Sequence, residues 1–192
     1  MKTTTALVLV LLLSLPPSPG LALAQQSTSN PARPRPESER LRQELLLLLS
    51  DVQSASAVLS AQSSYDEFMR DIGKINKRLS SIRSKYRTPL SRGDHKALGA
   101  PISDACAALY AAATDWKQVR LAAIELAGAQ RAVNNAASWE ADFYQRQLRA
   151  AQVKHAEAQR QLTDHTKTAL ALVHTATRAQ EESSKQAVAA RK

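Results

Sequence analysis

Apolar side chains recur along most of the chain at steps that alternate between three and four residues. In the first half, the recurring positions are Leu41, Leu45, Leu48, Val52, Ala55, Leu59, Tyr65, Phe68, Ile72, Ile75, Leu79, Ile82 and Tyr86. Such steps return to the same side of an α-helix, so the set forms one apolar stripe that packs against another helix. The period-two alternation of a half-buried strand is absent. The pattern therefore predicts an all-α fold with coiled-coil-like packing.

The same spacing continues in the second half of the chain. Its positions are Ile102, Cys106, Leu109, Ala113, Trp116, Val119, Ala123, Leu126, Ala141, Tyr144, Leu148, Ala151, His155, Ala158, Leu162, His165, Ala169, Leu172 and Ala176. Beyond residue 36, prolines occur only at Pro89 and Pro101, and they divide the two halves. We therefore expect a Leu/Ile-rich helical hairpin over 37–88, a Pro/Gly loop over 89–101, an Ala-rich helical hairpin over 102–180 and a frayed tail over 181–192.

Each hairpin needs a turn, and the sequence offers one candidate in each half. Ser64 and Glu67 have the spacing of a capping box, so a helix would begin near Ser64. In the second half, two Asn residues precede Ser138, which would cap a fourth helix. We expect an antiparallel bundle of about four helices. Because the apolar stripes run through both candidate turns, two long continuous helices remain the alternative.

The two turns also predict which residues face each other. A turn near residue 63 pairs Leu59 with Phe68, and the stripe positions farther from the turn pair in the same way, for example Leu48 with Leu79. A turn near residue 135 pairs Trp116 with His155, and it places Cys106 opposite His165. In this register, each apolar position of one helix meets an apolar position or a histidine of the next.

Residues 1–24 have the features of a secretory signal peptide. Lys2 gives a positive start, residues 6–15 form a ten-residue apolar run, and residues 22–24 (Ala-Leu-Ala) suit a signal peptidase. A membrane-spanning helix needs roughly 20 apolar residues, so we expect cleavage before Gln25 and no transmembrane span afterwards. Residues 25–36 carry three prolines and predict a disordered tether. The mature chain is expected to be periplasmic or secreted.

Composition and charge narrow the classes of function. One Cys excludes an internal disulfide framework. The segment 70–96 carries nine cations and two carboxylates, a net charge of +7. The candidate binding residues in it are Arg70, Lys74, Lys77, Arg78, Arg83, Lys85 and Arg87. A basic helix face attracts anionic partners such as an envelope polymer, lipid headgroups or an acidic protein, or it serves only solubility. No series of base-stacking aromatics accompanies it, which disfavours nucleic acid.

The sequence shows no nucleophile motif, phosphate-binding loop or metal-ligand spacing, so we assign no catalytic, cofactor or metal residues. We expect an exported, non-enzymatic helical binding protein of the cell envelope. A structural spacer that self-associates through the Ala-rich seam of residues 102–176 is the alternative. A metal- or thiol-dependent helical enzyme is a third hypothesis, which requires His165 and Cys106 in contact. The apolar run over 45–49 leaves open a docking surface for a partner helix.

Overall fold

A computed structural model describes residues 37–86, 90 and 95–189. The expected signal peptide, the tether and Arg87 lie outside these residues. The described chain forms four helices, α1 (Glu37–Ala61), α2 (Tyr65–Lys85), α3 (Lys96–Asn135) and α4 (Ala141–Ala189), and it contains no strand. The all-α prediction is confirmed, and the alternative of two uninterrupted helices is wrong.

The turn between α1 and α2 is built as its sequence predicts. Gln62 adopts a positive φ of 47°, which ends α1. The Ser64 hydroxyl then accepts a hydrogen bond from the backbone N–H of Glu67 at 3.3 Å and caps α2. Across the hairpin, Asp51 lies opposite Arg78 and Glu44 opposite Lys85. These contacts agree with the register expected from a turn near residue 63.

Helix α3 begins earlier than its prolines suggest. It starts at Lys96 and contains Pro101, whereas the expected loop extended to residue 101. The carbonyl of His95 accepts hydrogen bonds from the N–H groups of Leu98 and Gly99 and so closes the first turn. Pro101 lies in the second turn of α3, where it has no N–H to donate to the carbonyl of Ala97 and its ring crowds that carbonyl. The helix nevertheless continues through it. A proline this close to a helix start therefore does not mark the boundary.

Gly99 explains how the chain before α3 approaches the helix. A Cβ at this position would lie 2.4 Å from the carbonyl oxygen of Leu90. Leu90 itself is half-buried against the core. Glycine thus permits a close backbone contact that any other residue would obstruct.

The turn between α3 and α4 differs from the prediction. Residues 136–140 connect the helices, and α4 begins at Ala141 rather than after Ser138. Glu140 takes the capping position: its carbonyl accepts from the N–H groups of Phe143 and Tyr144, and its carboxylate accepts from the N–H of Ala137 at 3.4 Å. Ser138 lies within the connection, and no hydrogen bond from its side chain caps α4. The longer connection moves the centre of the turn away from residue 135.

This displaced turn shifts the register of the second hairpin. Lys154 lies opposite Glu125, whereas a turn at residue 135 would place position 146 there. His165 likewise lies opposite Asp115 rather than opposite Cys106. The expected pairing of Trp116 with His155 is therefore wrong. The stripe repeats every seven residues, so a shift of about one repeat again brings apolar positions together, and the long polar side chains of these two contacts reach one or two positions beyond it.

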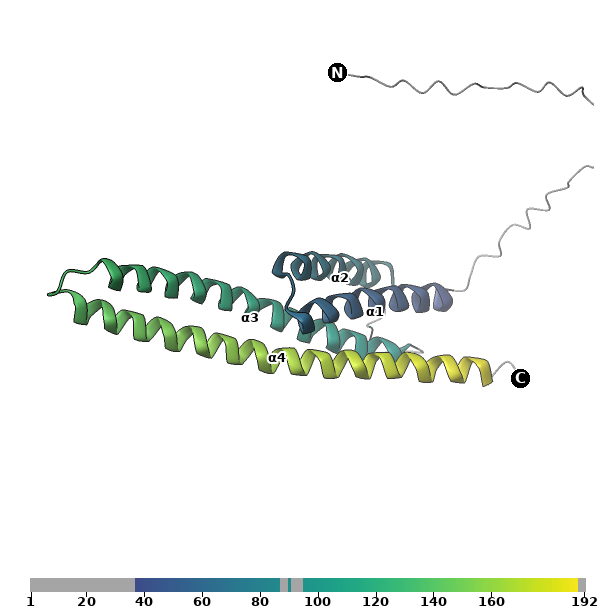
Figure 1. Cartoon of the computed structure of the whole chain (residues 1–192). Coiled ribbons are helices and arrows are strands. Elements are labelled where there is room, and N and C mark those ends of the chain that lie inside the picture. Colours follow the sequence, from purple (N-terminus) through teal and green to yellow (C-terminus); the bar gives the residue numbers. More distant parts are fainter. Residues whose placement is uncertain (1–36, 87–89, 91–94, 190–192) are drawn as a thin grey trace, which may run out of the picture. The chain divides into compact units, whose positions relative to one another are not determined.

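Residues 35–192 form one compact unit with two distinct parts. In the basal bundle, α1 and α2 pack over residues 96–120 of α3, and α1 also contacts residues 161–189 of α4 (Figure 1). In the distal arm, residues 121–160, only α3 and α4 lie side by side (Figure 1). The large buried side chains belong to the basal bundle, whereas only Ala122 and Ala158 are buried in the arm.

The junction between the two parts is closed by aromatic side chains. Trp116 packs against Phe68 and Tyr65, with ring centroids 5.3 and 5.8 Å apart. Arg120 covers the outer face of Tyr65 at 4.5 Å and forms an ion pair with Asp66 at 3.4 Å. The turn between α1 and α2 thus ends against the middle of α3, and the arm begins beyond it.

The C-terminal end of the Ala-rich hairpin also differs from expectation. Helix α4 runs on to Ala189, past the boundary at residue 180 where fraying was expected. The extension has a partner: the Arg42 guanidinium donates to the Ser183 carbonyl at 3.5 Å, and the Gln53 amide donates to Thr177 at 3.1 Å. The register expected from the sequence paired α4 with α3 alone, so it left this part of α4 without a neighbouring helix, whereas α1 lies there in the structure.

Helix α1 is long and apolar enough to cross a membrane or to act as a signal sequence, judged by length and composition alone. In the structure, Leu45, Leu48, Leu49, Val52 and Leu59 are buried against the other helices. A core helix of a helical bundle has the same properties. Only Leu47 of the run over 45–49 is exposed, so the expected docking surface for a partner helix is largely covered by the protein's own core.

Candidate functional site: a basic groove between α1 and α2

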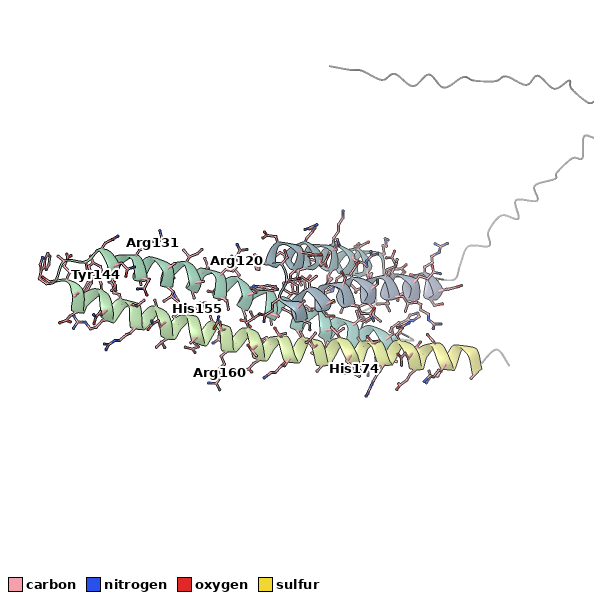
Figure 2. All side chains as sticks on the ribbon, in the orientation of Figure 1. Arg120, Arg131, Tyr144, His155, Arg160 and His174 are labelled. Atoms are coloured by element: carbon pink, nitrogen blue, oxygen red, sulfur yellow. The ribbon has the colours of Figure 1, made fainter. Side chains whose placement is uncertain are left out.

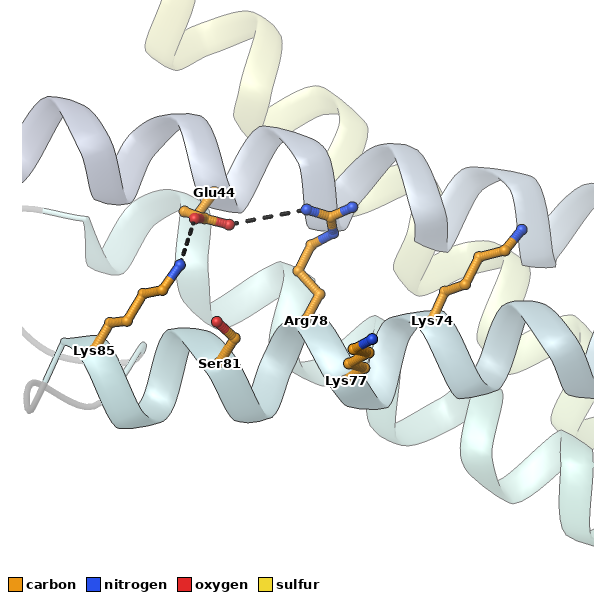
Figure 3. Close-up of a pocket in the computed structure, with 6 residues that line it drawn as sticks. All are labelled: Glu44, Lys74, Lys77, Arg78, Ser81 and Lys85. Atoms are coloured by element: carbon orange, nitrogen blue, oxygen red, sulfur yellow. Dashed lines mark hydrogen bonds and ion pairs between the residues drawn. The ribbon is translucent and has the colours of Figure 1, made fainter.

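The basic residues of α2 follow from its amphipathic sequence. Phe68, Ile72, Ile75, Leu79 and Ile82 are buried, and they orient the helix against the core. Four of the cations on the remaining surface of α2 lie next to α1. A groove of about 420 Å³ lies there, lined by Glu44 of α1 and by Lys74, Lys77, Arg78, Ser81 and Lys85 of α2 (Figure 3). Four of the seven predicted binding residues therefore share one groove.

Carboxylates of α1 hold two of these cations. The Arg78 Nε donates to Asp51 at 2.6 Å, and its Nη1 lies 3.8 Å from Glu44. Lys85 donates to the other oxygen of Glu44 at 3.0 Å (Figure 3). These three ion pairs join α1 to α2 in one register. They also neutralise part of the charge that the sequence places on α2, which sequence reasoning missed because the acids lie some 30 to 40 residues away.

Asp71 binds a third cation of the groove. It is 4% exposed, and it accepts hydrogen bonds from Lys74 at 2.6 Å and from Ser54 of α1 at 3.0 Å. Burial acts to raise the pKa of this carboxyl, but the hydrogen bonds from Lys74 and Ser54 and the charges of Lys74 and Arg70 outweigh it. The net result is a lowered pKa, so Asp71 is ionised at neutral pH.

The remaining predicted residues separate into two groups. Lys77 is exposed, lines the groove and forms no ion pair with any residue that the structure describes. Arg70 and Arg83 are exposed but do not line the groove; Arg83 instead acts electrostatically on Cys106 and Tyr110 of α3. Lys74, Lys77, Arg78 and Lys85, whose spacing predicts one helix face, thus share the groove, and Lys77 is the groove cation without a carboxylate partner among the described residues.

Cys106 and His165 do not form the pair that an enzymatic function would require. Cys106 is buried, and burial raises the pKa of its thiol to about 12. His165 is exposed and its Nδ1 contacts Asp115, which lies nine residues along α3 from Cys106, or about 13 Å. Within the described ranges, no group of three or more metal-ligating side chains gathers. A protonated, enclosed thiol is a poor nucleophile.

The arm carries a feature that the sequence analysis did not identify. Exposed large apolar side chains gather on it, namely Leu121, Ile124, Trp139, Phe143 and Val153. The apolar stripe alone could not reveal them, because a stripe predicts burial on one helix face without saying how many neighbours cover the others. The signal available in the sequence was the number of large apolar residues in the arm that lie outside the α3–α4 stripe.

Comparisons with protein-family models, with curated proteins and with solved structures gave no match, so the chemistry of the groove and the arm must carry the functional inference.

Proposed function

We propose that this chain is an exported, non-enzymatic binding protein that holds an anionic polymer of the cell envelope in the basic groove. The observation that carries the proposal is the groove itself, where four cations line one hollow. Three carboxylates, Glu44, Asp51 and Asp71, pair with three of these cations, and Lys77 has no carboxylate partner among the described residues. Export rests on the signal-peptide pattern of residues 1–24.

The ion pairs of the groove do not prevent binding. Lys74 and Lys85 remain more than half exposed, so a ligand can reach both ammonium groups. The Lys85–Glu44 pair is solvent-accessible, and pairs of this kind contribute about 0–1 kcal/mol, whereas Lys74 must keep its contact with buried Asp71 while it binds a ligand. Phosphate oxygens of a ligand can share or replace the carboxylate partners of these lysines. Lys77 can bind a phosphate group without losing a carboxylate partner, because it forms no ion pair with the described residues.

The length of the groove favours a polymer over a small anion. From Lys74 to Lys85 the helix rises about 16 Å, which exceeds the span of one phosphate group. A ligand with repeated negative charges can contact cations at both ends, and each added contact strengthens binding through effective concentration. A linear polyanion therefore fits better than a single headgroup.

Inorganic polyphosphate is the probe that tests the proposal. The variant Lys77→Gln with Lys85→Gln removes two groove cations but keeps Lys74 and Arg78, which satisfy Asp71 and Asp51. We expect about tenfold weaker binding or more, because two charge-assisted contacts are lost, and a weaker dependence on salt. The control variant Lys167→Gln with Arg178→Gln removes the same charge from exposed positions of α4.

The comparison between the two variants decides the outcome. If both bind polyphosphate as the unaltered protein does, or if both weaken equally, net charge and not the groove governs binding, and the proposal fails. Circular dichroism of each variant establishes that the helices are intact.

A structural spacer that self-associates is the second candidate function. The α3–α4 seam is already occupied within one chain, so the surface available for association is the exposed apolar set around Leu121 and Ile124. Several exposed large apolar side chains on one element are typical of contacts with a partner. Sedimentation at several concentrations tests it, and a strict monomer contradicts it.

A further inference from the structure

The end of the distal arm exposes aromatic side chains to an unusual degree. Trp139, in the connection between α3 and α4, is 80% exposed, whereas Trp116 in the core is 9% exposed. Phe143 is 53% exposed, and its ring meets the ring of Tyr144 edge-on at 5.3 Å. We call Trp139, Phe143 and Tyr144 the aromatic tip. Aromatic side chains left in water forgo most of the free energy that their burial supplies.

Cations stand directly behind the aromatic tip. Arg131 on α3 and Arg146 and Arg149 on α4 are exposed and form no ion pair within the described ranges. Figure 2 shows Arg131 and Tyr144 at the end of the arm where the two helices meet. The tip also has two acids: Glu140 is engaged with the N–H of Ala137, and Asp142 lies in the first turn of α4, near the positive end of the helix dipole.

The spacing of these groups matches the layers of a membrane surface. Arg131 lies about 6 Å before the end of α3, and Arg146 and Arg149 lie about 7 and 12 Å beyond the start of α4. The polar layer of a bilayer is about 5–8 Å thick on each side. With the aromatic tip at the boundary of the acyl chains, Arg131 and Arg146 lie at the depth of the lipid phosphates. Arg149 lies just outside that layer, and its long side chain can extend back to it.

We propose that the aromatic tip binds the surface of an anionic lipid membrane, with Trp139 and Phe143 entering the interface and the three arginines contacting lipid phosphates. Trp and Tyr favour this interface because the ring is apolar and one atom is polar. Clustered arginines add attraction to anionic headgroups. This surface is separate from the basic groove, so the inference does not depend on the proposed function.

Charge and shape favour lipid over a second copy of this chain. Two tips meeting end to end would bring like-charged Arg131, Arg146 and Arg149 of both copies together, which opposes association. The aromatic side chains also lie on a projecting helix end, which can enter a soft interface without a matching cavity. A second copy is therefore an outcome of the test rather than the proposal.

The fluorescence of Trp139 reports whether the aromatic tip enters a membrane. The experiment uses residues 25–192, because the apolar run over 6–15 would itself bind lipid and residues 35–192 form a compact unit without it. Vesicles of phosphatidylcholine alone are compared with vesicles containing equal phosphatidylcholine and phosphatidylglycerol. We expect the emission of Trp139 to move to shorter wavelength, with protection from acrylamide, only with the anionic vesicles. Trp139→Phe identifies the part of the signal that comes from buried Trp116.

Four variants sharpen the test. Binding of the variants is measured by co-sedimentation with vesicles, because one of them lacks Trp139. Trp139→Ala with Phe143→Ala should weaken binding to anionic vesicles about tenfold or more, and Arg146→Gln about fivefold. Asp142→Asn should strengthen it by up to about fivefold, with an unchanged circular dichroism spectrum and unchanged thermal unfolding that exclude binding through exposed core residues. The groove variant Lys77→Gln with Lys85→Gln should bind vesicles as the unaltered protein does, which separates this inference from the proposed function.

Several results would overturn the inference. These are an unchanged Trp139 emission with anionic vesicles, equal binding to uncharged vesicles, or loss of vesicle binding in the groove variant but not in the variant of the aromatic tip. A shift of Trp139 emission that follows protein concentration without vesicles would assign the tip to self-association instead.

Discussion

Helix α3 passes through two environments, and removing a leucine from each should reveal the difference. Leu109 lies in the basal bundle and is fully buried, at 0% exposure. Leu126 lies in the distal arm and is half-buried, where α4 is the one neighbouring helix. Substituting each by alanine removes the same atoms, so the two costs report how completely each site is enclosed.

The expected magnitudes follow from burial. Leu109→Ala loses the transfer free energy of the side chain and leaves a cavity within four helices, which together cost about 3 kcal/mol. Leu126→Ala opens no enclosed cavity, because solvent reaches the arm, and costs about 1 kcal/mol. For a domain of this size, about 1 kcal/mol corresponds to 2–4 °C in Tm, so the losses should be about 6–12 °C and about 2–4 °C.

Urea and thermal unfolding followed by circular dichroism measure both costs. Leu121→Ala is the matched control, because this leucine is exposed on the same arm and should change stability little. Equal costs at Leu109 and Leu126 would refute the division into an enclosed bundle and an open arm. A cost at Leu121 as large as that at Leu109 would show that another surface covers the arm.

Three further predictions test single features of the bundle. Asp71 has a lowered pKa in the folded state, so its contribution to the free energy of unfolding is present above the ordinary aspartate pKa of about 4 and is lost as the pH falls. In urea unfolding, Asp71→Asn should therefore lose less stability than the unaltered protein between pH 5 and 2. An identical pH profile for the two proteins contradicts this. Because burial raises the pKa of Cys106 to about 12, its thiol should resist Ellman's reagent at pH 8 until denaturant unfolds the chain, and rapid native labelling contradicts this. Gly99→Ala places a Cβ against the Leu90 carbonyl and should cost about 1–3 kcal/mol, whereas Gly128→Ala, which meets no neighbour, should stabilise slightly.

The first hairpin was predictable because its local signals were strong. Ser64 caps α2 as its spacing with Glu67 predicts, and the large side chains between Leu45 and Ile82 are the ones buried. Bulky Leu and Ile distinguish one helix face sharply, so both the helices and their register can be inferred. The same information predicted the cations of α2, although not their carboxylate partners on α1.

The second hairpin was less predictable because alanine carries little directional information. A stripe of small residues tolerates several registers, and the turn signal at Ser138 competed with Glu140, which caps α4 instead. The sequence also does not state how many helices cover a given stripe. The uncovered arm, with Trp139 at its end, depends on where α1 and α2 stop, and that is a property of the whole packing.

Amide chemical-shift mapping with polyphosphate tests the proposed groove most directly. Polyphosphate titrated into residues 25–192 should shift the backbone amide resonances of Lys74, Lys77, Ser81 and Lys85 first, together with that of Glu44 across the groove. Saturable shifts confined to these positions would support the proposal. Shifts spread evenly over all exposed cations, or centred on Arg146 and Arg149 of the arm, would contradict it.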